Sequence, residues 1–132
     1  MATTANLNNT PVQVDTTFDD IIVRKATHDI PGGKTLDVTG VADEVLKAGR
    51  IVIQNTTSGD MKLLLIVSGN YESLPSGYAY KGILKASILK TKPFASVVVG
   101  GEINEAAAVN YGLPAIPAEA KTALTHIIFT KD

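Results

Sequence analysis

Two histidines are the first residues of this chain that could take part in chemistry. His28 and His126 are its only imidazoles, and they lie too far apart in sequence to form a His-x-x-x-His metal motif on one helix. We interpret each as a surface or structural histidine, although a mixed site of histidine and carboxylate stays open. The chain has no cysteine, which excludes disulfides, thiolate metal sites and cysteine nucleophiles.

Carboxylates occur as Asp19-Asp20, Asp43-Glu44 and the pair Glu102 and Glu105. A buried carboxyl beside a solvated one could act as an acid-base couple, but adjacent acidic residues more often mark a solvated turn or strand edge. A helix start accounts for Asn104 and Glu105 together, because asparagine caps free amides and an acidic residue suits the first turn. We therefore predict no catalytic residue, no cofactor and no metal site, and we interpret the chain as a non-enzyme.

The segment Gly32-Gly33-Lys34-Thr35 approaches the end of a phosphate-binding loop. It lacks the upstream glycine of that motif, and the strand-like residues 36–38 follow where the motif needs a helix. A β-turn is the better interpretation.

Lysines and tyrosines offer possible contact surfaces. Lys81 and Lys85, with two further lysines before residue 93, form a local positive patch that could meet an acidic partner or guard an exposed strand edge. Tyr71, in a loop over 68–77, would point outward in a carbohydrate-binding module. Tyr78 and Tyr80 share the apolar side of their strand and are expected in the core or an interface.

Composition places the chain among small globular proteins. Its 132 residues with 45% hydrophobic content suffice for one compact domain. A formal net charge of −1 provides no general attraction to phosphate backbones, so we expect no nucleic-acid partner. We find no secretory signal or membrane-spanning run, and therefore expect no membrane partner and a cytoplasmic location during synthesis.

Short apolar segments separated by turn residues dominate the pattern. Residues 78–88 alternate, with Tyr80 and Leu84 on an apolar face and Lys81 and Lys85 on the other, while Gly100-Gly101 predicts a bulge. Strands are expected at 18–25, 35–41, 50–54, 61–67, 78–88, 94–103 and 125–130, and helical turns at 42–49, 104–108 and 117–124. The sequence therefore predicts a mainly β fold: a small antiparallel β-barrel or sandwich with two or three short helices and an extended N-terminal arm.

The arm comprises residues 1–17, ahead of a single compact domain at 18–132. It is rich in Thr and Asn and has too few apolar side chains to offset the entropy of ordering itself alone. One interpretation is a frayed terminus. The other is a strand-forming arm that becomes ordered against a partner, through Leu7, Pro11, Val12 and Val14.

Four motifs over roughly 47–129 carry a family resemblance. They are Gly82-Ile83-Leu84, the run from Val98 to Ala107 with its Gly-x-x-Asn-x-x-Ala pattern, Pro117 followed by Ala123-Leu124, and Ile127-Ile128-Phe129. In this order they resemble the C-terminal half of head decoration proteins of tailed bacteriophages, which are auxiliary capsid proteins of the head-fibre or capsid-stabilising kind.

The resemblance implies a virion structural protein on the exterior of an icosahedral head, made in the host cytoplasm. Its expected partners are the major capsid protein and, as in related families, further copies of itself in a homotrimer. We assign Lys81, Lys85, Asn104 and Glu105 to an oligomer or capsid interface as a hypothesis. The alternative function is a carbohydrate-binding or adhesion module, including a head-fibre base.

Overall fold

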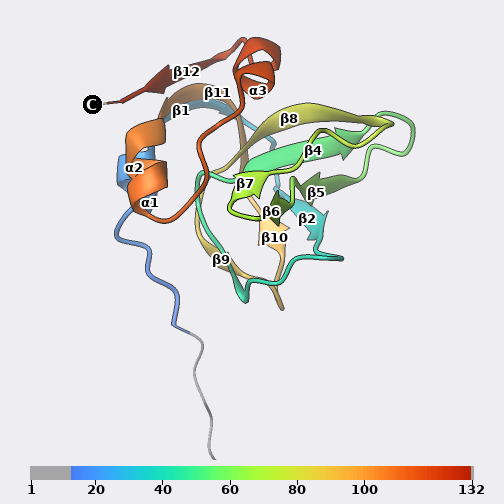
Figure 1. The fold of residues 1–132 in the computed structure, drawn as a ribbon, viewed down its shortest axis with the longest axis horizontal. Coiled ribbons are helices and arrows are strands. Elements are labelled where there is room, and N and C mark those ends of the chain that lie inside the picture. The colour runs from blue at the N-terminus through green and yellow to red at the C-terminus, as the bar shows by residue number, and fades with distance from the viewer. Residues whose placement is uncertain (1–12, 132) are drawn as a thin grey trace, which may run out of the picture.

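A computed structural model of the chain describes residues 13–131 (Figure 1). Of the expected arm contacts, Leu7, Pro11 and Val12 lie outside the described residues, whereas Val14 is described and half-buried.

The expected mainly β fold with short helices is confirmed. The helices are α1 (Asp19–Ile22), α2 (Glu105–Asn110) and α3 (Ala118–Ala123). The strands are β1 (Val23–Asp29), β2 (Lys34–Asp37), β3 (Val45–Leu46), β4 (Ile51–Asn55), β5 (Met61–Leu63), β6 (Ile66–Val67), β7 (Asn70–Tyr71), β8 (Tyr78–Leu84), β9 (Ile88–Leu89), β10 (Phe94–Ala95), β11 (Val97–Asn104) and β12 (Ile127–Thr130). No helix within 13–131 is long and apolar enough to cross a membrane.

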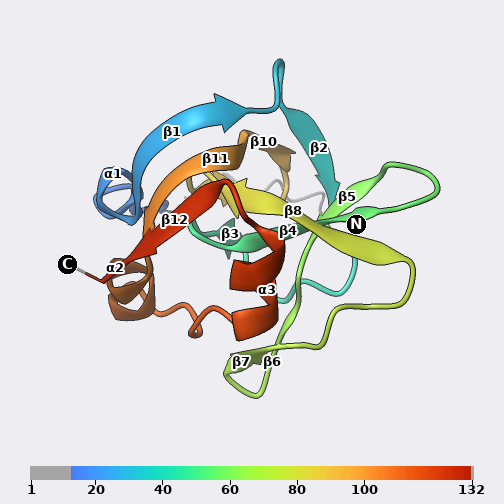
Figure 2. The same cartoon turned by 90° about the horizontal axis from the view of Figure 1, so that it is seen from above.

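One eight-stranded sheet forms the body of the domain. Its order is β1-β11-β8-β4-β5-β2-β10, and β12 also pairs with β11. Ser96 alone separates β10 from β11, so neighbouring parts of the chain pair with β2 on one side and with β8 on the other. The sheet consequently curls into a half-barrel (Figure 2).

The sheet is mixed rather than purely antiparallel. β11 with β12 and β2 with β5 are parallel pairs, and the other pairings are antiparallel. A parallel pair needs a crossover connection, and α2 and α3 occupy the connection between β11 and β12. The expectation of an antiparallel sheet missed these pairs because strand patterns do not encode the direction of a partner.

Both faces of the central strands are buried. Ile51 and Ile53 of β4 enter a core shared with the helices, while Val52 between them enters a second core among the strands. Each fully buried side chain of this size contributes roughly 1.5–3 kcal/mol. The alternation of β4 therefore joins the two cores through one strand.

A bulge in β8 changes which of its side chains share one face of the strand. Tyr80 pairs with Ile53 and Gly82 with Val52, which leaves Lys81 as an extra residue. Beyond the bulge, Ile83 rather than Leu84 joins the core that Tyr80 packs against. Strict alternation failed here because one inserted residue turns every later side chain to the other face.

Two segments differ from the expected elements. Residues 18–25 begin as α1 before β1 starts, and 42–49 contain β3 instead of a helical turn. β3 pairs with β9, so tertiary pairing overrides a weak local helical preference. Gly49 does adopt the expected left-handed conformation, with φ of 96°.

Asp19 departs from the expectation of a solvated acidic turn. Its carboxylate is buried and accepts from the Ser87 amide at 2.8 Å and the Ser87 hydroxyl at 2.7 Å. The same hydroxyl accepts from the Ala48 amide at 3.0 Å. This network joins α1 to the segments before β4 and β9, and the sequence carries no spacing that signals it.

Two further local predictions are confirmed, and a third is displaced by one residue. The strand register shifts around Gly100 and Gly101, as expected of a bulge. Asn104 caps α2 by accepting from the Ala107 amide at 3.1 Å. Pro117 lies one residue earlier than expected, as the N-cap of α3.

Candidate interface at the root of the N-terminal arm

A turn at residues 13–17 directs the chain away from the domain. The Asp15 carboxylate accepts from the Thr17 hydroxyl at 2.6 Å and from the Thr17 amide at 3.0 Å. These bonds, the hydroxyl bond first, lower the pKa of Asp15. The turn is therefore shaped by local side-chain bonds typical of Asp and Thr.

An aromatic contact fixes this turn to the domain. Phe18 stacks on Tyr111 with ring centroids 5.0 Å apart and planes at 19°, and the Tyr111 hydroxyl donates to the Asp15 carbonyl. On the domain side, Lys47 Nζ lies 4.8 Å from the Tyr111 ring centroid and donates to the Tyr111 carbonyl at 2.9 Å. An aromatic pair of this kind contributes roughly 0.5–1.5 kcal/mol beyond burial, so the point where the arm leaves is held in place.

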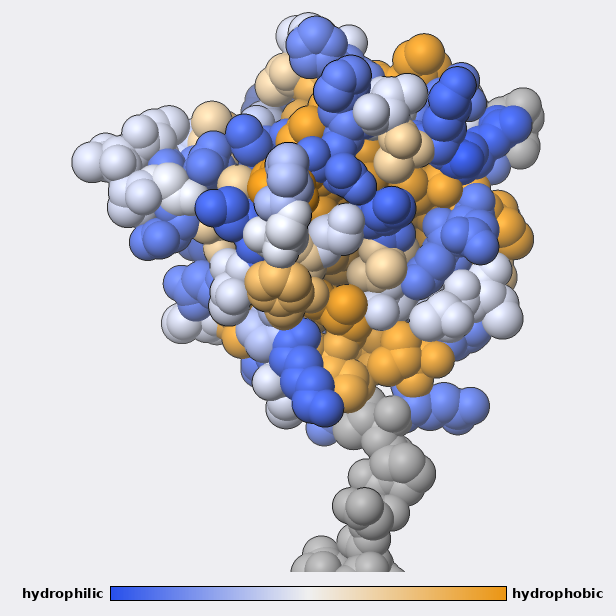
Figure 3. All heavy atoms as spheres, turned by 180° about the vertical axis from the view of Figure 1, so that it is seen from behind, coloured by the Kyte–Doolittle hydropathy of each residue, from blue (hydrophilic) through white to orange (hydrophobic). Residues whose placement is uncertain are grey.

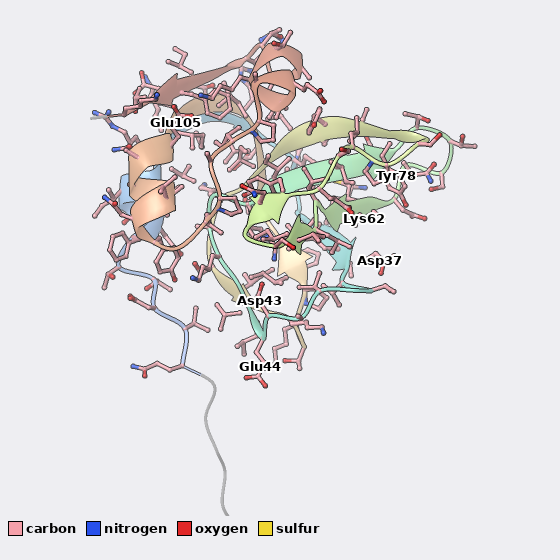
Figure 4. All side chains as sticks on the ribbon, viewed as in Figure 1. Asp37, Asp43, Glu44, Lys62, Tyr78 and Glu105 are labelled. Carbon is pink, nitrogen blue, oxygen red and sulfur yellow. The ribbon has the colours of Figure 1, made fainter. Side chains whose placement is uncertain are left out.

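A hollow of about 530 Å³ lies beside this contact. Lys47 and Gly112 line it next to Tyr111, and Asp43, Glu44 and Arg50 contribute its charged groups. Figure 4 shows Asp43 and Glu44 on the lower side of the domain, toward which residues 13–17 also run. The arm root and the hollow thus belong to one end of the molecule.

Arg50 is the unusual residue of this hollow because it is only 2% exposed. Its Nη2 donates to the Leu64 carbonyl at 3.0 Å, and its Nη1 lies 3.7 Å from the Asp43 carboxylate, whose side chain is 65% exposed. Nε and Nη1 have no hydrogen-bond partner within 13–131. A buried charge with incomplete pairing is costly, so this guanidinium is an incompletely satisfied group at the edge of a hollow.

Burial also governs the protonation equilibria around Arg50. Desolvation lowers the pKa of Arg50, while Tyr71 and Asp43 oppose that shift. Burial raises the pKa of Tyr71 to about 12, against the effect of the Arg50 charge. The sequence shows Arg50 only as a basic residue before the apolar run of β4, a pattern that does not indicate burial.

Apolar surface accompanies the arm root. Ile21 on α1 is 50% exposed, and Val109 on α2 is 47% exposed; these two helices pack together. Figure 3 shows hydrophobic side chains gathered on the lower part of the back face of the domain. Exposed apolar surface next to an anchored segment is typical of a contact surface.

The structure places the four interface candidates from the sequence in and beside β8 and at the junction of β11 with α2. Lys81 is half-buried in the β8 bulge, and Lys85 pairs with Asp29 at 3.5 Å. Asn104 is the last residue of β11 and Glu105 the first residue of α2, and both are buried. Their assignment to an interface stays a hypothesis.

Glu105 makes internal ion pairs. Its side chain is 10% exposed and lies 2.6 Å from Lys121 Nζ and 3.5 Å from Lys131 Nζ. These three residues line a separate hollow of about 330 Å³. His126 lines a different hollow, together with His28 and Val99.

The structure also places Tyr71, the candidate for a carbohydrate surface. Tyr71 packs against the core with its hydroxyl buried, so it does not present an outward ring for a sugar. Within the described part of the chain, no group of three or more His, Cys, Asp or Glu side chains could hold a metal ion.

Comparison with known proteins adds no assignment. No family model matches this chain, and no curated protein or solved structure matches it either.

Proposed function

We propose that this protein is a virion structural protein that binds the outer surface of an icosahedral phage head and stabilises or decorates it. The resemblance of the segment 47–129 to head decoration proteins supplies the capsid context. The structural observation that supports the mechanism is the contact of Phe18 with Tyr111, because it fixes where the arm leaves a rigid domain.

The arm binds by adding an extended segment to the major capsid protein. Each backbone hydrogen bond contributes roughly 1 kcal/mol, whereas ordering each arm residue costs about 1–2 kcal/mol. Burial of Leu7, Pro11, Val12 and Val14 in the partner must therefore supply the remaining stability. Anchoring the turn at residues 13–17 reduces the cost, because this part of the arm is already ordered.

The domain surface beside the arm contributes a second contact. Ile21 and Val109 offer apolar area, and the hollow at Arg50 offers a cation that a capsid carboxylate or carbonyl can reach if Asp43 moves aside. Association as a homotrimer would place three arms on neighbouring capsid subunits and raise the effective concentration of each.

Deletion of residues 1–12 tests the arm mechanism while keeping the Asp15 to Tyr111 contact. We expect a folded domain, shown by an unchanged circular dichroism spectrum, that no longer co-sediments with undecorated heads of the phage that encodes it. The double variant Leu7→Ser and Val12→Ser should also lose binding. The matched control, Asn8→Ser and Asn9→Ser, should retain it because no apolar side chain is lost. Undiminished binding of the truncated domain would refute the arm mechanism.

A further inference from the structure

The two histidines that are distant in sequence flank one position of the sheet. His28 of β1 lies opposite Gly100 of β11. On the other side of β11, Ile127 of β12 lies opposite Gly101, and the Gly101 amide donates to the His126 carbonyl at 3.1 Å. Gly100 therefore lies between the two histidines, and Figure 2 shows β1, β11 and β12 side by side.

The absent side chain of Gly100 leaves room for the imidazoles. A Cβ at this position would lie 3.4 Å from both Cβ and Nδ1 of His28 and 3.2 Å from the Thr27 hydroxyl. The His28 ring thus lies against the glycine that separates it from His126. His28, His126 and Val99 line a hollow of about 240 Å³ at this point, and both histidines are exposed to solvent.

We propose that His28 and His126 together bind one divalent transition-metal ion of the Zn²⁺, Ni²⁺ or Cu²⁺ class. Two strand spacings of about 4.8 Å place their backbones roughly 10 Å apart. Two imidazoles and two metal–nitrogen bonds of about 2.0–2.1 Å can span that separation. Imidazole suits these metals, whereas Mg²⁺ and Ca²⁺ prefer oxygen ligands.

The site has two protein ligands and leaves the other coordination positions to water. It is therefore weaker than a four-ligand structural zinc site. The ion joins β1, near the start of the domain, to the residue that precedes β12, near its end. Because the unfolded chain does not hold the two imidazoles together, binding stabilises the folded state.

Titration of the full chain, prepared without a histidine tag, with ZnCl₂ and NiCl₂ in an isothermal calorimeter tests the proposal. We expect one ion per chain, a rise in the unfolding temperature with added Zn²⁺, and no response to MgCl₂. His28→Gln and His126→Gln should each weaken binding at least about tenfold, since even loss of a supporting neighbour costs roughly 10–100-fold in metal affinity. Thr125→Gln, beside His126, serves as the matched control and should bind as the native chain does.

Three results would overturn the site. They are no binding at millimolar metal, undiminished binding by either histidine variant, and one ion shared by two chains. The substituted side chains are exposed, so the variants should remain folded, and their unfolding temperatures without metal would verify this. Loss of the metal response in Gly100→Ala would add support, because its Cβ occupies space beside the His28 ring.

Discussion

Buried charged side chains are paired differently at the two ends of α2. At its first residue, Glu105 is paired with Lys121 and Lys131. At its C-cap, Tyr111 adjoins the hollow in which buried Arg50 makes one hydrogen bond and one longer ion pair. Side chains of the domain pair Glu105, whereas Arg50 keeps hydrogen-bonding capacity that solvent in the hollow or a bound partner can use.

Removal of the Arg50 side chain should have the largest effect on stability. Arg50→Ala leaves a cavity and a Leu64 carbonyl without its donor, so we expect the free energy of unfolding to fall by roughly 2–5 kcal/mol. Arg50→Met also removes the donor to Leu64 but keeps most of the side-chain volume, so it should cost less than Arg50→Ala, roughly 1–3 kcal/mol. Urea denaturation of both variants measures this difference. Equal destabilisation by Met and Ala would mean that the charge is fully used within the domain, and the contrast between the two ends of α2 would disappear.

The fold was predictable where local pattern decides structure. The apolar run of β4, the glycine pair in β11 and the cap at Asn104 are determined by side-chain period, backbone freedom and a short-range hydrogen bond. These features act within a few residues, so the sequence shows them directly. The bulge at Lys81 could not be read in the same way, because it depends on how β8 aligns with β4.

The candidate sites were less predictable because they depend on long-range contacts. Arg50 becomes buried through the packing of segments around β4, and Asp19 through a bond to Ser87. The two histidines line one hollow because β1 and β12 flank the same strand. No spacing in the sequence encodes these approaches; they follow from sheet order.

The Tyr71 hydroxyl provides a second test at the Arg50 end. Its pKa is raised from 10.0 to about 12 by burial, so the neutral form is favoured in the folded state. The associated stability is fully present below pH 10 and is lost as the pH rises toward 12. The native chain should therefore lose about 2 kcal/mol more than Tyr71→Phe over this interval.

At neutral pH, Tyr71→Phe should lower the stability of the domain by less than about 1 kcal/mol, since the hydroxyl makes no hydrogen bond of normal geometry within 13–131, although the Ile51 backbone lies close enough to oppose the rise in its pKa. Denaturation of both chains at pH 7, 9, 10 and 11.5 separates this hydroxyl from the other titrating groups. A loss of more than about 1.5 kcal/mol in Tyr71→Phe at pH 7 would show that the hydroxyl is bonded in solution, and the hollow at Arg50 would then be better satisfied than its geometry indicates.

The smallest effects are expected at the Glu105 end, where the two lysines should not be equivalent. Lys121 lies 2.6 Å from the carboxylate and is 36% exposed, whereas Lys131 lies at 3.5 Å and is 76% exposed. We expect Lys121→Ala to cost about 1 kcal/mol and Lys131→Ala less than about 0.5 kcal/mol, because an exposed pair gains little and is screened by salt. Double-mutant cycles with Glu105→Gln, at low salt and at 1 M NaCl, isolate each coupling. If the two coupling energies are equal and equally sensitive to salt, both lysines act as solvated charges. Glu105 would then be no better paired than Arg50. The pairing of buried charge would no longer distinguish the two ends of α2.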